Sequence, residues 1–355
     1  MSKTIKINYD FIDALRFISM FGIVMEHSSF FFGAKFKSFD EKIIQIFSLQ
    51  FFKFGTIIFF LLAGFLIGDK FNTYSTKEYL KRRLDNTVKP WLFWVVVLLT
   101  LNYTDVAVRN LKSGDSIFYS KTVEIFFADL GNIIFNTSFW FIPNFLICIA
   151  ILLLCRKYLY NLYFGGFLMV LSLLYSINLY LDIFPTSHTT ALFGFIFYLW
   201  LGVQINRYYE QFKLIIQKTS LLILAVLTLI TFLFSSIESY YLLVKLPTDP
   251  FNTLRITNIL YSLVCFALLY KLGNKISLQK FKPSIFTFGI YLVHQILVFR
   301  LMPLIFRPLN INFENKSAYY FLAMQLLTFA VVYTGSILIV YLINKSKKAR
   351  WVVGR

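Results

Sequence analysis

Long apolar runs, without a regular polar position inside them, dominate the pattern of this chain. Examples are IIFFLLAGFLI (57–67), WLFWVVVLLTL (91–101) and LLILAVLTLITFLF (221–234). Each run sits in a window of about 20 residues that is poor in charge, which is the length a helix needs to cross a bilayer. The pattern therefore predicts an all-α, polytopic membrane protein whose helices form a transmembrane bundle.

Windows of this kind recur along the chain and predict about ten transmembrane helices. They are residues 10–32, 50–70, 88–104, 133–155, 160–181, 188–206, 214–235, 253–272, 284–306 and 318–343. We expect one integral membrane domain over residues 1–355, with spans at roughly 10–343 and no attached soluble domain. No cleavable signal peptide is expected, because the first apolar run is too long and too interrupted for a signal core.

The composition changes this picture little. Of the 355 residues, 58% are hydrophobic and 15% are charged, whereas a soluble protein has about 25% charged residues. The 43 Phe and 22 Tyr residues suit lipid-facing surfaces and interfacial belts. Cys148, Cys155 and Cys265 have neither metal-ligand spacing nor the pattern of a disulfide framework, so no metal site is expected.

The positive charges predict an orientation. If the N-terminus is cytoplasmic, most of the 35 Lys and Arg residues fall on the cytoplasmic side, in segments 3–6, 70–89, 156–157, 207–218, 271–282 and 345–355. This asymmetry predicts that both termini are cytoplasmic and that the protein lies in the inner (plasma) membrane of a bacterium. The net charge of +18 also favours contact with anionic membrane lipids. Nucleic acid is not an expected partner, because the basic residues are scattered over many short loops.

The first predicted helix carries ionisable side chains that hydrocarbon disfavours. The stretch FIDALRFISMFGIVMEHSSFFFG (11–33) contains Asp13, Arg16, Glu26 and His27. Such side chains in a span usually face a protein interior or a watery cavity. Arg16 and His27 are eleven residues apart, which is three turns plus about 20° of rotation and about 16 Å along the axis. They are therefore predicted to share one face, with Arg16 nearer the cytosol and His27 nearer the outside.

That face suits a long anionic donor that enters from the cytosol. Arg16 is a candidate to hold a phosphate or to polarise a carbonyl, and His27 is a candidate proton acceptor for an incoming hydroxyl. Asp13 is placed to pair with Arg16. Glu26 points about 100° away from His27, so a structural role is expected for it. A second interpretation stays open, in which Arg16 reaches the inner interface and His27 hydrogen-bonds inside the bundle.

Six further segments carry a family resemblance. They are FIDALR (11–16) followed by His27, FFLLAGFLIGDKF (59–71), YLKRRLDNTVKPW (79–91), SFWFIPNFLICIAILLL (138–154), GFIFYLWLGVQINRY (194–208) and FGIYLVHQILV (288–298). In this order they resemble the motifs of the membrane-bound acyltransferase-3 family. The family's motif of an arginine, ten residues and a histidine falls on Arg16 and His27.

The resemblance implies transfer of an acyl group, usually acetyl, from acyl-coenzyme A to a sugar hydroxyl. It implies acetyl-CoA as a co-substrate with no permanently bound cofactor, and a surface polysaccharide or lipid-linked glycan as acceptor. It also implies exopolysaccharide biosynthesis and polysaccharide-assembly machinery as partners. The family's Arg-x-x-Arg motif would start at Arg83, but its second position is Asn86. Arg82 or Lys89 is therefore expected to replace the second arginine in binding donor phosphates.

Three more residues are candidates for substrate binding. Trp140 has a ring that can stack on a sugar, and Tyr291 and His294 share nearly one helix face. Interfacial anchoring and interhelical hydrogen bonding are the competing interpretations. A different class of function, an exporter or flippase of a glycan precursor without acyl transfer, also fits a bundle with internal charges. Transporters often show repeats and interrupted helices, which this sequence does not display clearly.

Overall fold

The computed structural model describes most of the chain, and its described part consists of helices and connecting segments without a strand. The described residues are 10–32, 34–71, 74–113, 122–187, 191–245, 249–276, 278–309, 311 and 313–355. The basic residues predicted on the cytoplasmic side within 1–9 lie outside this range. The prediction of an all-α fold is confirmed for the described residues.

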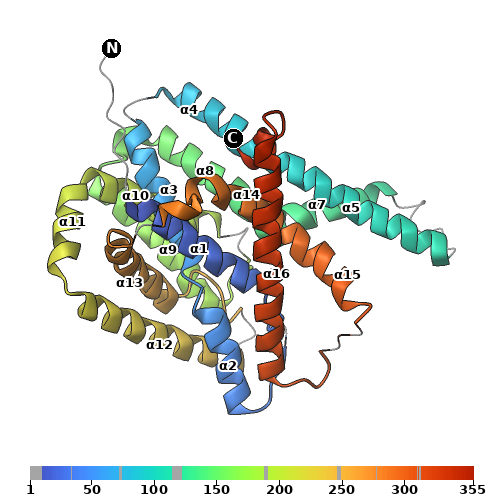
Figure 1. The fold of residues 1–355 in the computed structure, drawn as a ribbon. Helices are drawn as coiled ribbons and strands as arrows, with labels where there is room; N and C mark the ends of the chain where they lie inside the picture. Colours follow the sequence, from blue (N-terminus) through green and yellow to red (C-terminus); the bar gives the residue numbers. More distant parts are fainter. Residues whose placement is uncertain are drawn as a thin grey trace.

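The helices follow the chain in the order shown in Figure 1. The α-helices are α1 (Asp10–His27), α2 (Phe39–Gln50), α3 (Gly55–Phe71), α4 (Thr76–Arg83), α5 (Lys89–Ser113), α7 (Thr122–Asn136), α8 (Phe141–Leu154), α9 (Leu162–Leu181), α10 (Leu192–Arg207), α11 (Tyr209–Lys218), α12 (Leu221–Lys245), α13 (Ile256–Gly273), α14 (Pro283–Ile296), α15 (Met302–Phe306) and α16 (Ala318–Lys345). The 3₁₀ segments are η2 (Ser138–Trp140), η3 (Arg156–Tyr158), η4 (Gln279–Phe281) and η6 (Arg350–Val353), and the π-helical segments are η1 (Leu84–Val88) and η5 (Leu297–Leu301).

The predicted membrane spans are found in part. Within the described residues, seven helices are long and apolar enough to cross a membrane, or eight if the pair α7–α8, bent by 72°, forms one broken span. The predicted spans 10–32 and 188–206, which correspond to α1 and α10, are not among these helices. Four of the 18 residues of α1 are charged, and the 16 residues of α10 extend only about 24 Å against a hydrocarbon core of about 30 Å. The multi-pass bundle is therefore shown, whereas the count of about ten stays a prediction.

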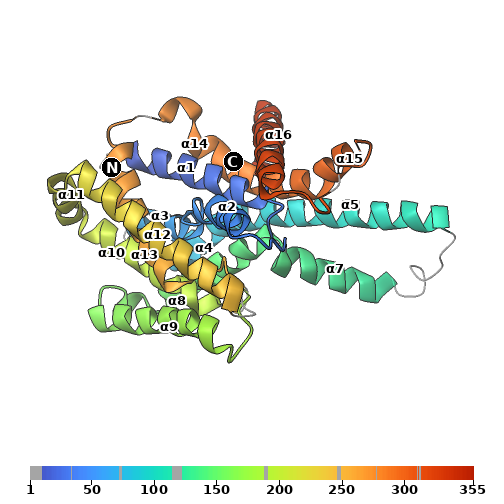
Figure 2. The same ribbon diagram turned by 90° about the horizontal axis from the view of Figure 1, so that it is seen from below.

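Helix α1 runs through the middle of the bundle. Figure 2 shows α14 and α16 on one side of α1, and α3 and α13 on the other, and α1 contacts all four. Phe11 and Leu15 belong to the apolar core shared with α3 and α13, whereas Met20 and Val24 belong to the core shared with α14 and α16. Because apolar stripes hold α1 on two sides, its polar stripe is fixed in rotation.

The crossing of α3 and α10 depends on two glycines. A Cβ at Gly64 would lie 1.9 Å from the Leu199 carbonyl oxygen, and one at Gly202 would lie 2.1 Å from that of Leu61. Small residues allow membrane helices to approach this closely, so that packing replaces the hydrophobic effect that is missing in lipid. Helix α3 forms part of the cavity wall described below, and this contact therefore fixes the wall as well.

Gly64→Ala is expected to lower the free energy of unfolding by about 3 kcal/mol, because the added methyl group forces two backbones apart. Thermal unfolding in detergent, followed with a thiol-reactive dye, measures this change since Cys148 and Cys265 are free and buried. Gly166→Ala in α9 is the matched control, because its Cβ would meet nothing within 4 Å. Equal melting temperatures for both variants would contradict the role of the glycine contact.

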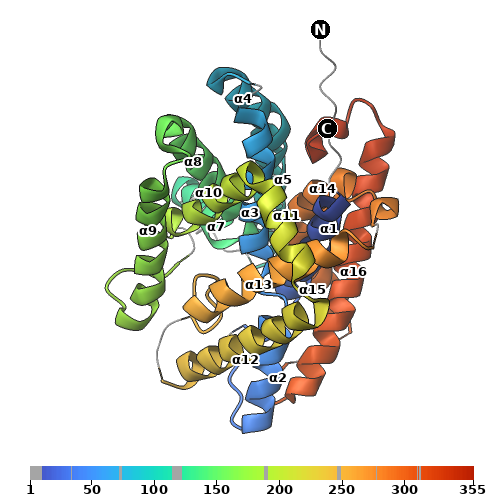
Figure 3. The same cartoon turned by 90° about the vertical axis from the view of Figure 1, so that its left-hand side faces the viewer.

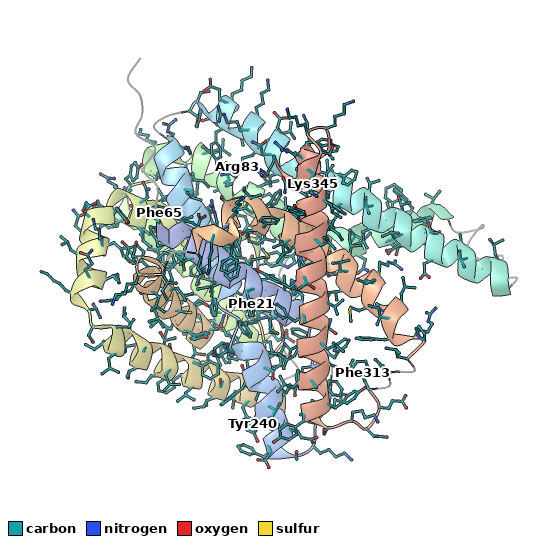
Figure 4. All side chains as sticks on the ribbon, viewed as in Figure 1. Phe21, Phe65, Arg83, Tyr240, Phe313 and Lys345 are labelled. Carbon is teal, nitrogen blue, oxygen red and sulfur yellow. The ribbon has the colours of Figure 1, made fainter. Side chains whose placement is uncertain are left out.

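Two of the basic segments lie at the same end of the bundle. Figure 3 shows α4 and the C-terminal segment at the same end of the bundle. Figure 4 places Arg83 and Lys345 toward that end, and Tyr240 and Phe313 toward the opposite end. Helix α4 and the C-terminal segment thus lie on one side, as the predicted orientation expects of their basic residues. That this side faces the cytoplasm stays a prediction.

Candidate active site

A cavity of about 450 Å³ lies alongside α1. This volume is within the range of about 300–1,000 Å³ that is typical of small-molecule pockets. Helices α1, α3, α8 and α14 and the segments η1 and η2 supply most of its wall. Arg83 at the end of α4, Thr253 from the segment before α13 and Gly354 from the C-terminal segment complete the wall.

Helix α1 contributes one continuous stripe to the cavity. Its members are Arg16, Met20, Ile23, Glu26 and His27, and steps of three or four residues put side chains on one side of a helix. The structure therefore brings Arg16 and His27 into the same cavity. Their Cα atoms are separated by about 16 Å along the helix axis, so they face different parts of any ligand.

A second imidazole, that of His294, contacts His27 on the side away from the cavity. His294 of α14 is completely buried, and its Nε2 lies 2.9 Å from Nδ1 of His27. The two ring planes differ by 8° and their centroids are 5.2 Å apart. These values describe two imidazoles joined edge to edge by a hydrogen bond. Because His294 does not reach the cavity wall, His27 stands between it and the ligand space.

A backbone carbonyl assigns the proton positions in this pair. Nδ1 of His294 lies 3.1 Å from the carbonyl oxygen of Ile290. A carbonyl only accepts, so Nδ1 of His294 carries the proton and its Nε2 accepts the hydrogen bond that Nδ1 of His27 donates. In neutral His27 the lone pair then lies on Nε2. This tautomer is the form that a general base requires.

The other end of the cavity is basic. Nη1 of Arg16 lies 3.5 Å from Oδ1 of Asp13, which is the ion pair that their spacing predicts. Arg83, the last residue of α4, donates from Nε to the Tyr79 hydroxyl at 2.7 Å and lies over its ring, 5.0 Å from the centroid. Both arginines line the cavity. Guanidinium groups bind phosphates well because they offer several N–H donors in a fixed plane.

The π-helical segment η1 shapes this basic end. It begins directly after Arg83 and carries Asn86 and Thr87, and all three residues lie on the cavity wall. Single π-helical turns inside α-helices are frequent at functional sites. Here the turn joins α4 to α5 and places consecutive side chains toward the ligand space.

A buried ion pair lies next to His27. Nζ of Lys53 donates to Oε1 of Glu26 at 2.5 Å, and the two side chains are only 4% and 14% exposed. Within the described residues, the Glu26 carboxylate makes no other hydrogen bond, although Glu26 lies on the cavity wall. Its second oxygen can therefore accept a hydrogen bond from a hydroxyl-bearing ligand. The structural role expected for Glu26 is present in this ion pair, and a ligand contact is available besides.

One comparison with known proteins identifies the family. A family model described as an acyltransferase domain, that of the acyltransferase-3 family, matches residues 9–345. The chain belongs to the acyltransferase-3 family. No curated protein and no solved structure matches it. Family membership and the apolar helices together identify a multi-pass membrane acyltransferase.

In this acyltransferase-3 protein, the two positions of the family's Arg-x-x-Arg motif both face the cavity, as Arg83 and Asn86. The expected substitutes for the second arginine do not. Arg82 is exposed and lies over the Tyr74 ring, 4.2 Å from its centroid, and Lys89 is exposed and paired with Asp85 at 2.5 Å. Neither expected substitute lies on the cavity wall, because adjacent helix positions point about 100° apart and only one side of the helix meets the cavity. Their part in binding donor phosphates stays a prediction.

Of the three candidates for substrate binding in the acyltransferase-3 site, two line the cavity and one does not. Trp140 and Tyr291 line the cavity. The Tyr291 hydroxyl donates to the Ser138 carbonyl at 2.7 Å, which leaves the ring as its main surface toward a ligand. His294 is hidden behind His27, and the substrate contact expected for it is replaced by the hydrogen bond between the two imidazoles.

Sequence reasoning missed several contributors to the acyltransferase-3 site, among them Lys53, Thr253 and Gly354. A lysine inside an apolar window was a usable signal, because such a charge usually has a partner in the bundle. The apolar Trp-Val-Val run at 351–353, after the basic end of α16, was a second signal. No such signal existed in the sequence for Thr253, because its position on the cavity wall depends on how the segment before α13 folds back.

Proposed function

We propose that the protein is an O-acyltransferase that moves an acyl group, acetyl in the first instance, from cytosolic acyl-CoA to a glycan hydroxyl. The acceptor is a surface polysaccharide or a lipid-linked sugar at the bacterial plasma membrane. One observation carries the proposal: a single cavity has two guanidinium groups at one end and an imidazole with its lone pair on Nε2 near the other.

His27 is the proposed general base. Its Nε2 takes the proton of the acceptor hydroxyl while the hydroxyl oxygen attacks the thioester carbonyl. The carbon–sulfur bond then breaks, and the proton on His27 passes to the departing thiolate. The products are the O-acyl ester and free coenzyme A, so atoms and charges balance.

Arg16 and Arg83 are proposed to bind the donor. Because about 16 Å of helix separate Arg16 from His27, a guanidinium at Arg16 is too distant to stabilise negative charge on the reacting carbonyl. Binding of the anionic part of the donor suits its place better. Glu26 beside His27 is proposed to receive a second hydroxyl of the sugar, with Lys53 as its buried counter-charge.

The test uses purified protein in lipid nanodiscs with radiolabelled acetyl-CoA. Octyl glucoside and cell-envelope polysaccharide from the source bacterium serve as acceptors. We expect label on the sugar and stoichiometric release of coenzyme A. Movement of glycan across vesicles without any acylation would support the exporter hypothesis instead and would refute the proposed reaction.

Arg16→Ala is expected to raise the KM for acetyl-CoA about 10- to 100-fold, because one charge-assisted interaction is worth about 1.5–3 kcal/mol. The KM for the acceptor should change less than twofold. Initial rates at varied donor and fixed acceptor measure the first value, and the reverse titration measures the second. Arg16→Lys keeps the charge, so its KM for acetyl-CoA should lie between those of the wild type and Arg16→Ala. Unchanged donor saturation in Arg16→Ala would remove Arg16 from the donor site.

A further inference from the structure

The segment that follows α16 turns back and becomes part of the cavity wall. Val352 and Val353 of η6 are buried, and the Trp94 indole donates to the Val352 carbonyl at 2.7 Å. Gly354 then lies on the cavity wall. This segment lies outside the family match, which ends at residue 345.

Gly354 brings the segment close to the basic end of the cavity. Its φ is +79°, a conformation that glycine adopts without penalty. A Cβ there would lie 2.6 Å from the Phe288 ring and 2.8 Å from the Asn86 carbonyl oxygen. The backbone therefore approaches η1 within a distance that other residues would not allow. This contact sets the C-terminal segment beside the turn that follows Arg83.

Two arginines, Arg350 and Arg355, lie in the same C-terminal segment as Gly354. Arg355 follows Gly354 and is exposed, and its Nη1 donates to Oδ1 of Asn344 at 3.3 Å. Arg350 donates from Nε to the Asn344 carbonyl at 2.9 Å. Each bond uses one of the five N–H donors of a guanidinium. The other N–H groups of exposed Arg355 remain accessible to an anion.

The volume of the cavity indicates which part of coenzyme A fits inside it. Coenzyme A is larger than a drug-sized ligand, and about 450 Å³ is in the lower half of the range for drug-sized pockets. The cavity therefore has room for the narrow acyl-pantetheine arm, while the phosphate-bearing nucleotide end stays at the mouth. That end carries several negative charges. Arg83 and Gly354 both line the cavity, at the end of the bundle where α4 and the C-terminal segment lie.

We propose that the C-terminal segment 350–355 and Arg83 together form a subsite for the phosphate-bearing nucleotide end of coenzyme A. This inference rests on the proposed function, since it assumes an acyl-CoA donor. Gly354 shapes the mouth through which the pantetheine arm passes, and the Arg355 guanidinium contacts the phosphates. The C-terminal segment is thus a donor-binding element.

The experiment measures calorimetric binding of two probes, coenzyme A and phosphopantetheine, to the full chain in nanodiscs. Arg355→Ala is expected to weaken binding of coenzyme A about tenfold and to change phosphopantetheine binding less than twofold, because the latter lacks the nucleotide. Arg355→Lys should restore part of the loss. Arg82→Ala is the matched control, because it removes the same charge from another exposed arginine at the same end of the bundle, one that is not part of the proposed subsite.

The outcomes separate the two proposals. Wild-type affinity for coenzyme A in Arg355→Ala, or a loss no larger than in Arg82→Ala, overturns the C-terminal subsite and leaves the proposed reaction standing. An equal loss for both probes overturns the contact with the nucleotide end. Failure of the wild-type protein to bind coenzyme A overturns the proposed function and this subsite together.

Discussion

His27→Ala is expected to abolish measurable acyl transfer, with kcat lower by about 10²- to 10⁴-fold, the usual contribution of a positioned general base. The side chain removed carries the lone pair assigned to Nε2, and no second imidazole reaches the cavity wall among the described residues. Binding of coenzyme A should stay within twofold of wild type, because Arg16 and Arg83 lie at the other end of the cavity. Label transfer at saturating donor and acceptor measures kcat.

The control for His27→Ala concerns folding. The substitution removes the N–H group that donates a hydrogen bond to Nε2 of buried His294, and leaving a buried acceptor unsatisfied costs about 1–3 kcal/mol. His27→Gln retains a side-chain amide that can donate to Nε2, yet it has no basic nitrogen. Both variants should be inactive, with the Gln variant closer to wild type in melting temperature. Activity near wild type in either variant would eliminate His27 as the base.

The sequence predicted the part of the site that lies within one helix. Arg16 and His27 share a stripe because the helical period alone determines their relative direction. The ion pair of Asp13 with Arg16 could be predicted for the same reason. No knowledge of the rest of the fold was needed for either relation, since both depend on residues in α1.

Relations between helices could not be predicted in this way. His27 and His294 are separated by 267 residues, and their contact depends on the rotation and depth of both α1 and α14. Hydropathy encodes neither quantity. The choice of Arg83 over its neighbour Arg82 for the cavity wall has the same origin, because a basic cluster at a helix end does not say which side of the helix meets the ligand.

Hydropathy predicted a bundle of membrane helices, but α1 and α10 are not typical transmembrane helices. Helix α1 is charged because its polar stripe faces the cavity, while its apolar stripes pack against four other helices. Helix α10 is short, and it packs against α3, α8 and α9 inside the bundle. Burial of this kind removes the requirement that a helix match the thickness of the lipid by itself. A helix packed in this way can therefore fall short of a test based on length and hydropathy.

His294→Leu is expected to lower kcat by about 10²-fold, although His294 does not touch the cavity. Leucine cannot accept the hydrogen bond from Nδ1 of His27, so the tautomer with the lone pair on Nε2 loses its stabilising partner. His294→Gln offers a carbonyl oxygen as acceptor and should keep most of the activity. Donor and acceptor KM values should change less than threefold in both variants, since neither substitution alters the wall.

A purely structural role for His294 would give a different pattern. In that case kcat would follow the melting temperature, and Leu and Gln would act alike at equal stability. The double variant His27→Ala with His294→Leu adds a second test, because residues that act as one unit show strongly non-additive losses. We expect the double variant to be no slower than His27→Ala alone. If the two losses instead multiplied, His294 would act independently of His27, and the hydrogen bond from Ile290 through His294 to His27 would not be what prepares the base.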